Sequence, residues 1–78
     1  MNFSQALDLL KDGRKLSRMG WNGKGMWLSL QVPDAKSKMT LPYIYMRTVN
    51  WHLVPWIASQ ADLLADDWCV VETPEDFA

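Results

Sequence analysis

The first residues of the chain carry the pattern of an amphipathic helix. Apolar side chains recur at the i, i+3, i+4 and i+7 spacing that aligns them on one helical face, namely Phe3, Ala6, Leu7 and Leu10. Asn2 is a favoured N-cap residue, and Gln5 three positions later completes a capping box. Gly13 is well placed to end the helix. The pattern therefore predicts a helix from Asn2 to Gly13.

Beyond the first helix, the pattern changes to short alternating or β-branched stretches separated by Gly and Pro. The strongest strand signal is Met-Trp-Leu-Ser-Leu-Gln-Val, which Pro33 ends. Ser59 is a favoured helix cap, with Asp62 at the capping-box position. The predicted elements are strands at 15–19, 26–32, 41–49 and 53–54, a turn at 50–52, a helix at 59–65 and a strand at 68–72. This order predicts an α+β fold with a small, mostly antiparallel sheet, an N-terminal helix and a short helix before the last strand.

The length of 78 residues predicts a single domain over 1–78, with 73–78 as a loose tail. A chain this short buries only about 60–65% of the surface that it exposes when unfolded, so its core is small. The single cysteine, Cys69, excludes an intrachain disulfide, and no Cys/His cluster offers a zinc site. Self-association is the remaining way to stabilise such a domain.

Charge and hydropathy narrow the class of partner. Eight Lys and Arg against nine Asp and Glu give a net charge of −1, which argues against a nucleic-acid polymer as partner. No apolar run approaches the ~20 residues of a membrane span, and no signal-peptide core follows Met1. The sequence therefore predicts a soluble, intracellular protein that does not interact with membranes.

The aromatic content is unusual, because five Trp and five Met replace the Leu, Ile and Val that normally fill a small core. Large flat rings on a small body cannot all be buried, so some are expected at an interface or in a pocket. Three of these large residues are assigned to the core or to an oligomer face, namely Trp27, Met46 and Trp68.

Catalytic and metal-binding chemistry is poorly represented. His52 is the single histidine, and nothing near it in the sequence is a nucleophile or acid for it to work with. Cys69 sits in an apolar stretch, where a free cysteine usually packs as a small hydrophobe. Asp62, Asp66 and Asp67 lack the ligand spacing of a calcium loop and are expected to be solvated or capping. The sequence therefore predicts no enzyme, no metal and no cofactor.

Two segments remain as candidate binding sites. Residues 20–25 (Gly-Trp-Asn-Gly-Lys-Gly) contain the backbone freedom to cradle an anion, although an Asn-Gly pair is more often a hairpin turn. In residues 55–62, Trp56 offers a stacking face just before a helix start whose N–H groups and Ser59 hydroxyl suit a phosphate. An ordinary capped helix with a core Trp explains the second segment equally well.

The same two segments carry a family resemblance. Residues 20–26 (Gly-Trp-Asn-Gly-Lys-Gly-Met) resemble the first signature of a small phage and prophage family of formerly unknown function. Residues 55–68 resemble its second signature. The N-terminal helix and residues 41–46 also resemble the corresponding segments of the family. The similarity spans nearly the whole chain, with two separated motifs in order. This family includes the second type of Thoeris anti-defence protein.

The resemblance implies a sponge, a protein that captures a cyclic nucleotide immune signal without degrading it. The implied ligand is a cyclic ADP-ribose isomer such as 1''-3' glycocyclic ADP-ribose, with cyclic dinucleotides as a further class. It also implies a homotetramer with pockets shared between protomers, acting in the cytoplasm of the infected or lysogenic bacterial host. The alternative is a protein–protein inhibitor of a defence effector such as a CRISPR nuclease. Such inhibitors often mimic nucleic acid with dense negative charge, which this chain lacks. A structural phage protein without a ligand also stays open.

The resemblance also implies residue roles. The base stacks on Trp21, Tyr43 or Trp56. The candidate ligand-binding residues are Trp21, Asn22, Gly23, Lys24, Tyr43, Arg47, Trp56, Ala58, Ser59, Gln60 and Asp62.

The resemblance also implies which group of the ligand each polar candidate binds. The Asn22–Gly23 backbone and the Ser59–Gln60 helix start are expected to take phosphates and ribose hydroxyls. Asp62 or Asn22 accepts a hydrogen bond from a ribose hydroxyl or a base amine. Lys24 or Arg47 supplies the positive charge that a dianionic ligand needs.

Overall fold

The N-terminal helix forms as predicted in the computed structural model of the chain, which describes residues 1–21 and 24–72. Helix α1 (Phe3–Lys11) has Asn2 as its N-cap, and the Asn2 and Gln5 side chains form the reciprocal capping box. Gly13 follows the helix at φ 93°, a left-handed conformation that glycine adopts without strain. The capping pattern of the sequence thus defines both ends of this helix.

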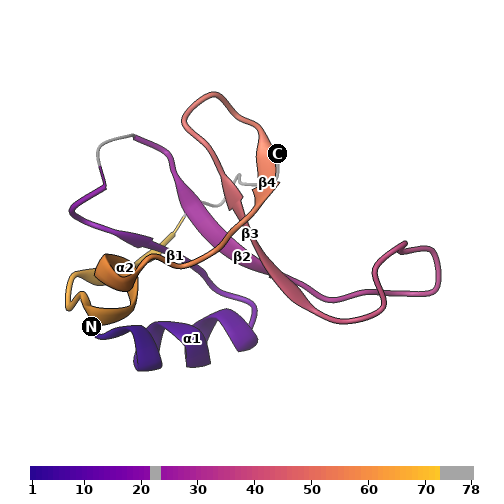
Figure 1. Ribbon diagram of the computed structural model, residues 1–78, viewed down its shortest axis with the longest axis horizontal. Helices are drawn as coiled ribbons and strands as arrows, with labels where there is room; N and C mark the ends of the chain where they lie inside the picture. The colour runs from indigo at the N-terminus through magenta and orange to yellow at the C-terminus, as the bar shows by residue number, and fades with distance from the viewer. Residues whose placement is uncertain (22–23, 73–78) are drawn as a thin grey trace.

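Five antiparallel strands form one sheet within the described residues, in the order β4-β3-β2-β1-β5 (Figure 1). The strands are β1 (Lys15–Arg18), β2 (Trp27–Gln31), β3 (Tyr43–Arg47), β4 (Leu53–Pro55) and β5 (Trp68–Val71). A short helix, α2 (Gln60–Leu64), precedes β5. The α+β fold predicted from the sequence is confirmed.

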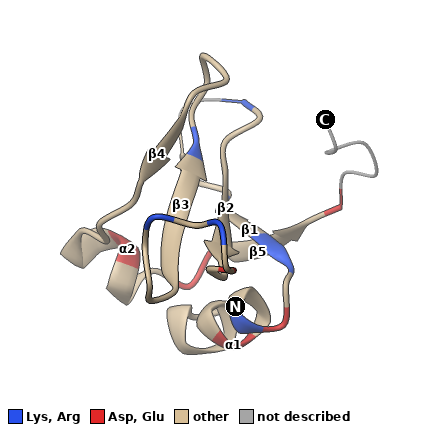
Figure 2. Cartoon of the chain, turned by 90° about the vertical axis from the view of Figure 1, so that its right-hand side faces the viewer, with Lys and Arg blue, Asp and Glu red and all other residues tan. Residues whose placement is uncertain are grey.

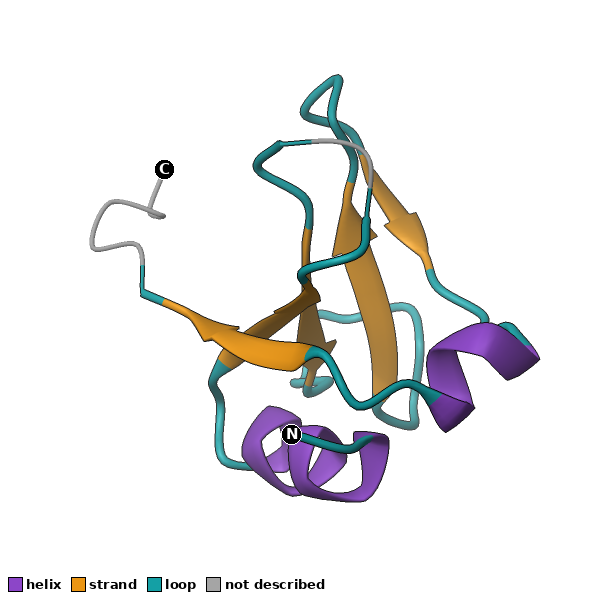
Figure 3. Ribbon diagram, turned by 90° about the vertical axis from the view of Figure 1, so that its left-hand side faces the viewer, coloured by secondary structure: helices purple, strands orange, loops and turns teal. Residues whose placement is uncertain are grey.

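The core lies between one sheet face and α1, which packs on β1, β2 and β5 (Figures 1 and 3). Leu16 is paired with Leu28, and Leu28 with Met46, so these side chains share that face. The cluster of buried residues that results consists of Ala6, Leu10, Leu16, Leu28 and Trp68. Met46 is half-buried against this cluster.

The opposite sheet face carries a second set of aromatic contacts. Trp27 is buried there, with its ring in an edge-to-face contact with Tyr45 at a centroid distance of 6.1 Å. The Lys15 ammonium lies 4.9 Å from the centroid of the Trp27 ring. Trp27 and Trp68 therefore pack on opposite faces of the sheet, as side chains of the protein interior.

Several strand ends differ from the prediction by one residue, and both ends of β3 differ by two. The strand expected over 41–49 is limited to β3, because Pro33 ends its partner β2 soon after Gln31 and Thr48 already belongs to the turn. That turn starts at Thr48, whose N–H donates to the His52 carbonyl at 2.8 Å. Pro55 is the last residue of β4 and does not stop the strand before it. An edge strand tolerates a proline because one side of its backbone has no partner strand.

The predicted hairpin around residues 20–25 is confirmed, since this segment joins the antiparallel strands β1 and β2. Asn22, Gly23 and the tail at 73–78 lie outside the described residues. In the part of the chain that is described, neither helix has the length and apolar content needed to cross a membrane.

Candidate functional site

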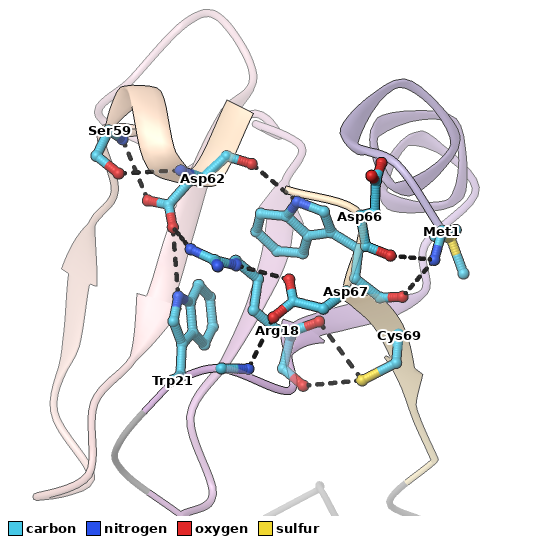
Figure 4. A network of polar contacts seen from close by, with 11 residues as sticks. Met1, Arg18, Trp21, Ser59, Asp62, Asp66, Asp67 and Cys69 are labelled. Atoms are coloured by element: carbon cyan, nitrogen blue, oxygen red, sulfur yellow. Dashed lines mark hydrogen bonds and ion pairs between the residues drawn. The ribbon is translucent and has the colours of Figure 1, made fainter. Parts of the chain in front are cut away.

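The guanidinium of Arg18 joins two distant parts of the chain. Its Nε donates to Asp67 Oδ1 at 2.8 Å, and its Nη1 donates to Asp62 Oδ1 at 2.9 Å (Figure 4). Arg18 ends β1, Asp62 belongs to α2, and Asp67 directly precedes β5. One side chain thus connects three elements that surround the start of the glycine-containing loop 20–25. We call Arg18, Trp21, Ser59, Asp62 and Asp67 the Asp62 cluster.

Asp62 is a buried carboxylate whose oxygens both have partners. Its residue is only 9% exposed, and Oδ1 also accepts from Trp21 Nε1 at 3.4 Å. Oδ2 accepts from the backbone N–H of Ser59 at 3.1 Å, while the Ser59 hydroxyl accepts from the Asp62 N–H at 3.1 Å. The capping box predicted for α2 is therefore confirmed. The Asp62 carboxylate of this capping box also serves as a counter-ion of Arg18. Without a partner of opposite charge, the buried carboxylate would destabilise the fold.

Asp67 fixes the beginning of the loop. Its Oδ2 accepts from the backbone N–H of Gly20 at 2.9 Å. A Cβ at position 20 would lie 2.9 Å from the same oxygen, so a side chain there would push the carboxylate away. Gly20 is needed for this close approach. The expectation that Asp67 is solvated or capping was wrong, because Arg18 lies on the buried sheet face and requires a counter-charge.

Both carboxylates are held in the ionised form. Burial alone would raise the pKa of Asp62, but the hydrogen bonds from Arg18, Ser59 and Trp21 outweigh it and lower the pKa below 3.8. The hydrogen bond from Arg18 lowers the pKa of Asp67 below the same value. The hydrogen bonds to Asp67 and Asp62 raise the pKa of Arg18 in return. All three groups therefore stay charged at neutral pH.

Aromatic rings surround the cluster. The Trp68 indole donates to the Asp62 carbonyl at 2.9 Å, which ties the buried ring to α2. Trp21 and Trp56 meet the Trp68 ring edge-to-face, at centroid distances of 5.4 and 6.1 Å. Both of these outer rings are half-buried, so part of each remains exposed to solvent. Trp21 and Trp56, from the two candidate segments, thus pack on the same core residue.

Arg47 lies at the other end of the same loop. Its Nη1 donates to the Gly25 carbonyl, and its guanidinium carbon lies 3.6 Å from the centroid of the Trp51 ring. Gly25 has φ 78°, and a Cβ there would lie 2.9 Å from Arg47 Nη1. Lys24, next to Gly25, is exposed. Loop 20–25 is therefore held at both ends, by Asp67 at Gly20 and by Arg47 at Gly25.

The candidate residues fall into separate places. Trp21, Trp56, Ser59 and Asp62 come together around Trp68, as described above. Ala58 is half-buried just before the cap of α2, and Gln60 is the exposed first residue of that helix. Tyr43 lies apart from both loop ends, because it starts β3 opposite Gln31 whereas Arg47 ends that strand. Asn22 and Gly23 lie outside the described residues.

Sequence reasoning missed Arg18, although a signal was present. Leu16 and Arg18 are two positions apart in a strand, so they share a face, and Leu16 is fully buried. A cation next to a core leucine on the same face indicates a buried ion pair. Within residues 1–21 and 24–72, no three His, Cys, Asp or Glu side chains are grouped in a way that could hold a metal ion.

Comparison with known proteins assigns the chain to a family. The model of the Thoeris anti-defense 2-like domain matches residues 1–71. The chain belongs to the Thoeris anti-defense 2-like family. It is similar to Thoeris anti-defense 2 of Bacillus phage SP01, at 36% identity over 84 aligned residues that cover 91% of this chain and 94% of the relative. The family resemblance noted in the sequence is confirmed, and a phage anti-defence role against Thoeris follows from it.

Proposed function

We propose that this protein counters Thoeris defence as a sponge, binding a cyclic nucleotide immune signal and holding it without chemical change. The proposed ligand class is a cyclic ADP-ribose isomer such as glycocyclic ADP-ribose, with cyclic dinucleotides as a further class. The proposed place of action is the cytoplasm of the infected or lysogenic bacterium, where such a signal would be met. Sequestration requires tight binding and no turnover.

The observation that carries this proposal is the meeting of the two family signature segments at the Asp62 cluster. Trp21 comes from the first segment and Trp56 from the second, and both half-buried rings contact Trp68. Trp21 also donates to Asp62, whose carboxylate accepts from the N–H of Ser59 at the start of α2. Aromatic faces next to hydroxyl and amide groups match the base and ribose of a nucleotide. The ion pairs of Arg18 fix this arrangement before any ligand arrives, which lowers the entropic cost of binding.

The protonation state of the cluster supports holding over turnover. A general acid must carry a proton near its operating pH, and an effective catalytic pKa lies close to that pH. Asp62 and Asp67 have pKa values below 3.8, because they accept hydrogen bonds from Arg18. His52 lies elsewhere, in the turn between β3 and β4. The carboxylates are therefore suited to positioning neighbours and poorly suited to proton transfer.

We also propose that the protein assembles as a homotetramer with nucleotide pockets shared between protomers. Large apolar side chains are exposed along β4, the following segment and α2, an unusual concentration for a chain of 78 residues. They are Leu53, Val54, Ile57, Leu63 and Leu64. Sedimentation equilibrium should return four times the 9.0 kDa mass of the chain. A monomer at micromolar concentration would contradict the assembly.

The same exposed apolar residues favour a second candidate, a protein–protein inhibitor that docks on a defence effector. The two functions differ in what stabilises the protein. A sponge is stabilised by the nucleotide alone, whereas a docking inhibitor is stabilised by its target protein alone.

The test is thermal unfolding with a panel of glycocyclic ADP-ribose, cyclic dinucleotides, NAD and ADP-ribose. A ligand at about 100 times its Kd adds roughly 2.7 kcal/mol to the free energy of unfolding, which shifts the melting temperature clearly. We expect one cyclic nucleotide to give this shift. The absence of a shift across the whole panel would contradict the proposal.

A matched pair of variants locates the site. Ser59→Ala and Asn2→Ala each remove one capping box, so each should cost about 1 kcal/mol of stability. Ser59 borders the proposed ligand, whereas Asn2 caps the other helix. We therefore expect Ser59→Ala alone to weaken nucleotide binding. Equal binding by the two variants would place the ligand elsewhere.

A further inference from the structure

Trp51 occupies a backbone conformation that suits glycine. Its φ is 69°, and among the non-glycine residues in 1–21 and 24–72 it is the one in the left-handed region. Its N–H donates to the Thr48 carbonyl at 2.9 Å, so a tight turn leads directly into this position at the tip of the β3–β4 hairpin. Glycine ordinarily takes such a position, because a side chain there is strained. A bulky aromatic residue at this point therefore calls for a role.

The Trp51 side chain lies outside the core and contacts a cation. The residue is 73% exposed, and the Arg47 guanidinium carbon lies 3.6 Å from the centroid of its ring. At this distance the indole face attracts the guanidinium and limits the rotamers of a long, flexible side chain. Trp51 can therefore act on the rest of the molecule through Arg47.

Arg47 in turn holds the end of the first signature segment. Its Nη1 donates to the carbonyl of Gly25, whose backbone is left-handed at φ 78°. A Cβ at position 25 would lie 2.9 Å from Nη1, so glycine permits the close approach. Two left-handed positions, Gly25 and Trp51, thus contact the same guanidinium. The three residues form a chain of contacts from the hairpin tip to the signature segment.

No carboxylate competes for the Arg47 guanidinium in the part of the chain that the structure describes. Residues 20–25 and 47–52 contain no Asp or Glu. Figure 2 shows blue positions at the end of β3 and in the adjoining loop, with no red along the drawn part of these two segments. A long side chain without an ion pair samples several rotamers, so the indole face is what restricts Arg47 to the Gly25 carbonyl.

We propose that Trp51 is a positioning residue for nucleotide binding. It keeps Arg47 on the Gly25 carbonyl and thereby fixes the end of the signature segment that carries Lys24. This exposed cation shares its segment with Trp21, so its placement affects the binding of an anionic ligand. The inference rests on the proposed function for its ligand, a cyclic nucleotide. Because affinity falls with the fraction of molecules in the competent arrangement, the strength of the ring contact limits the loss on removing Trp51.

The test is calorimetric titration of Trp51 variants with glycocyclic ADP-ribose. Trp51→Leu keeps an apolar side chain but removes the aromatic face, whereas Trp51→Phe keeps a face. We expect Trp51→Leu to bind roughly 2- to 30-fold more weakly, the range that corresponds to a lost cation–π contact. Trp51→Gly, which the left-handed backbone accepts, should lose as much, and Trp51→Phe should recover most of the affinity. Wild-type affinity in Trp51→Leu would overturn the proposal.

A double-mutant cycle shows whether Trp51 acts through Arg47. Arg47→Gln removes the guanidinium, so adding Trp51→Leu to this variant should cause no further loss of affinity. Losses that multiply would mean that the ring acts independently of Arg47, which would contradict the positioning role. The control is Leu41→Ala, because Leu41 is 75% exposed, much like Trp51, and precedes β3 whereas Trp51 follows it. The affinity of this control should equal that of the wild type.

NMR spectra of the unliganded variants separate positioning from overall stability. The Gly25 backbone N–H signal should shift in Trp51→Leu and return in Trp51→Phe. The indole N–H signal of Trp21, which donates to Asp62, should stay unchanged in both. A Gly25 signal that does not respond to Trp51→Leu would overturn the positioning role. If the wild type binds no cyclic nucleotide, the sponge fails and the positioning role fails with it. If the wild type and Trp51→Leu bind equally well, the positioning role alone fails.

Discussion

Arg18 and Arg47 each end a strand and hold one end of loop 20–25, but their surroundings differ. Arg18 is half-buried and gives its charge to two carboxylates, which in turn cap α2 and fix Gly20. Arg47 meets a backbone carbonyl and an exposed indole ring, and no carboxylate among the described residues balances its charge. The first arginine is therefore structural, while the second leaves charge and aromatic surface for a partner.

This contrast separates the polar groups that stabilise this small domain from those that are available to bind a partner. Where every donor and acceptor has a partner, as at Asp62, substitution should affect stability first. Where a charged group and a ring are exposed, as at Trp51, substitution should affect binding and leave stability almost unchanged. Substitutions of the two arginines' partners and of an exposed reference pair test this division.

Asp62→Ala should destabilise the protein by about 3 kcal/mol, because it leaves Arg18 without one partner and removes the capping-box bond from the Ser59 N–H. Urea unfolding followed by circular dichroism measures this loss. Asp66→Ala is the matched control, since Asp66 is exposed and uses its backbone carbonyl for its contact with Met1. The control should stay within about 0.5 kcal/mol of the wild type. If both variants lose the same free energy of unfolding, the Asp62 cluster does not stabilise the fold as described.

Acid should weaken the same cluster. Asp62 and Asp67 have native pKa values below the unfolded value near 3.8, so the unfolded state binds protons first as the pH falls. Their contribution is complete above about pH 5 and is lost as the pH falls through about 4 and then through the native values. Urea unfolding at a series of pH values should show this decline. Arg18→Gln should flatten it, and an unchanged acid profile in that variant would be evidence against the ion pairs.

Trp51→Gly should leave the free energy of unfolding within about 0.5 kcal/mol of the wild type. Relief of the left-handed strain, about 1–2 kcal/mol, offsets the lost cation–π contact and the extra entropy of glycine. Thermal unfolding of the variant without ligand measures the balance. A loss as large as that of Asp62→Ala would mean that Trp51 is part of the structural framework, and the contrast between the two arginines would disappear.

Arg14→Gln should have the smallest effect. Arg14 pairs with Glu72 at 2.8 Å, but the two side chains are 46% and 76% exposed, so water and salt screen the attraction. We expect a loss of at most a few tenths of a kcal/mol, reduced further in 1 M salt. This variant provides the exposed reference against which the Arg18 pairs are judged.

Local patterns in the sequence predicted most of the fold. The capping boxes of Asn2 with Gln5 and of Ser59 with Asp62 involve residues three positions apart, so sequence alone reveals them. The alternating stretches located every strand, with one-residue errors at several strand ends and two-residue errors at both ends of β3. Those ends depend on the partner strand and on a turn hydrogen bond from Thr48 to His52, which no single stretch displays.

The candidate functional site was harder to predict from local sequence patterns than the fold. Arg18 and Asp67 are 49 positions apart, and only the pairing of β1 with β5 brings them together. Trp51 is not a typical turn residue, so its left-handed backbone could not be read from its type. The two signature segments were found through the family resemblance. Their meeting around Trp68 emerged from the packing of the whole chain.

The most direct test of the sponge is the fate of its ligand. The protein is saturated with glycocyclic ADP-ribose, separated from unbound nucleotide, heated to unfold it and cleared of precipitate, and the released nucleotide is analysed by chromatography and mass spectrometry. The sponge mechanism predicts recovery of the unchanged cyclic nucleotide in a fixed ratio to the protein. Recovery of a linear or cleaved product, or of no nucleotide at all, would contradict it.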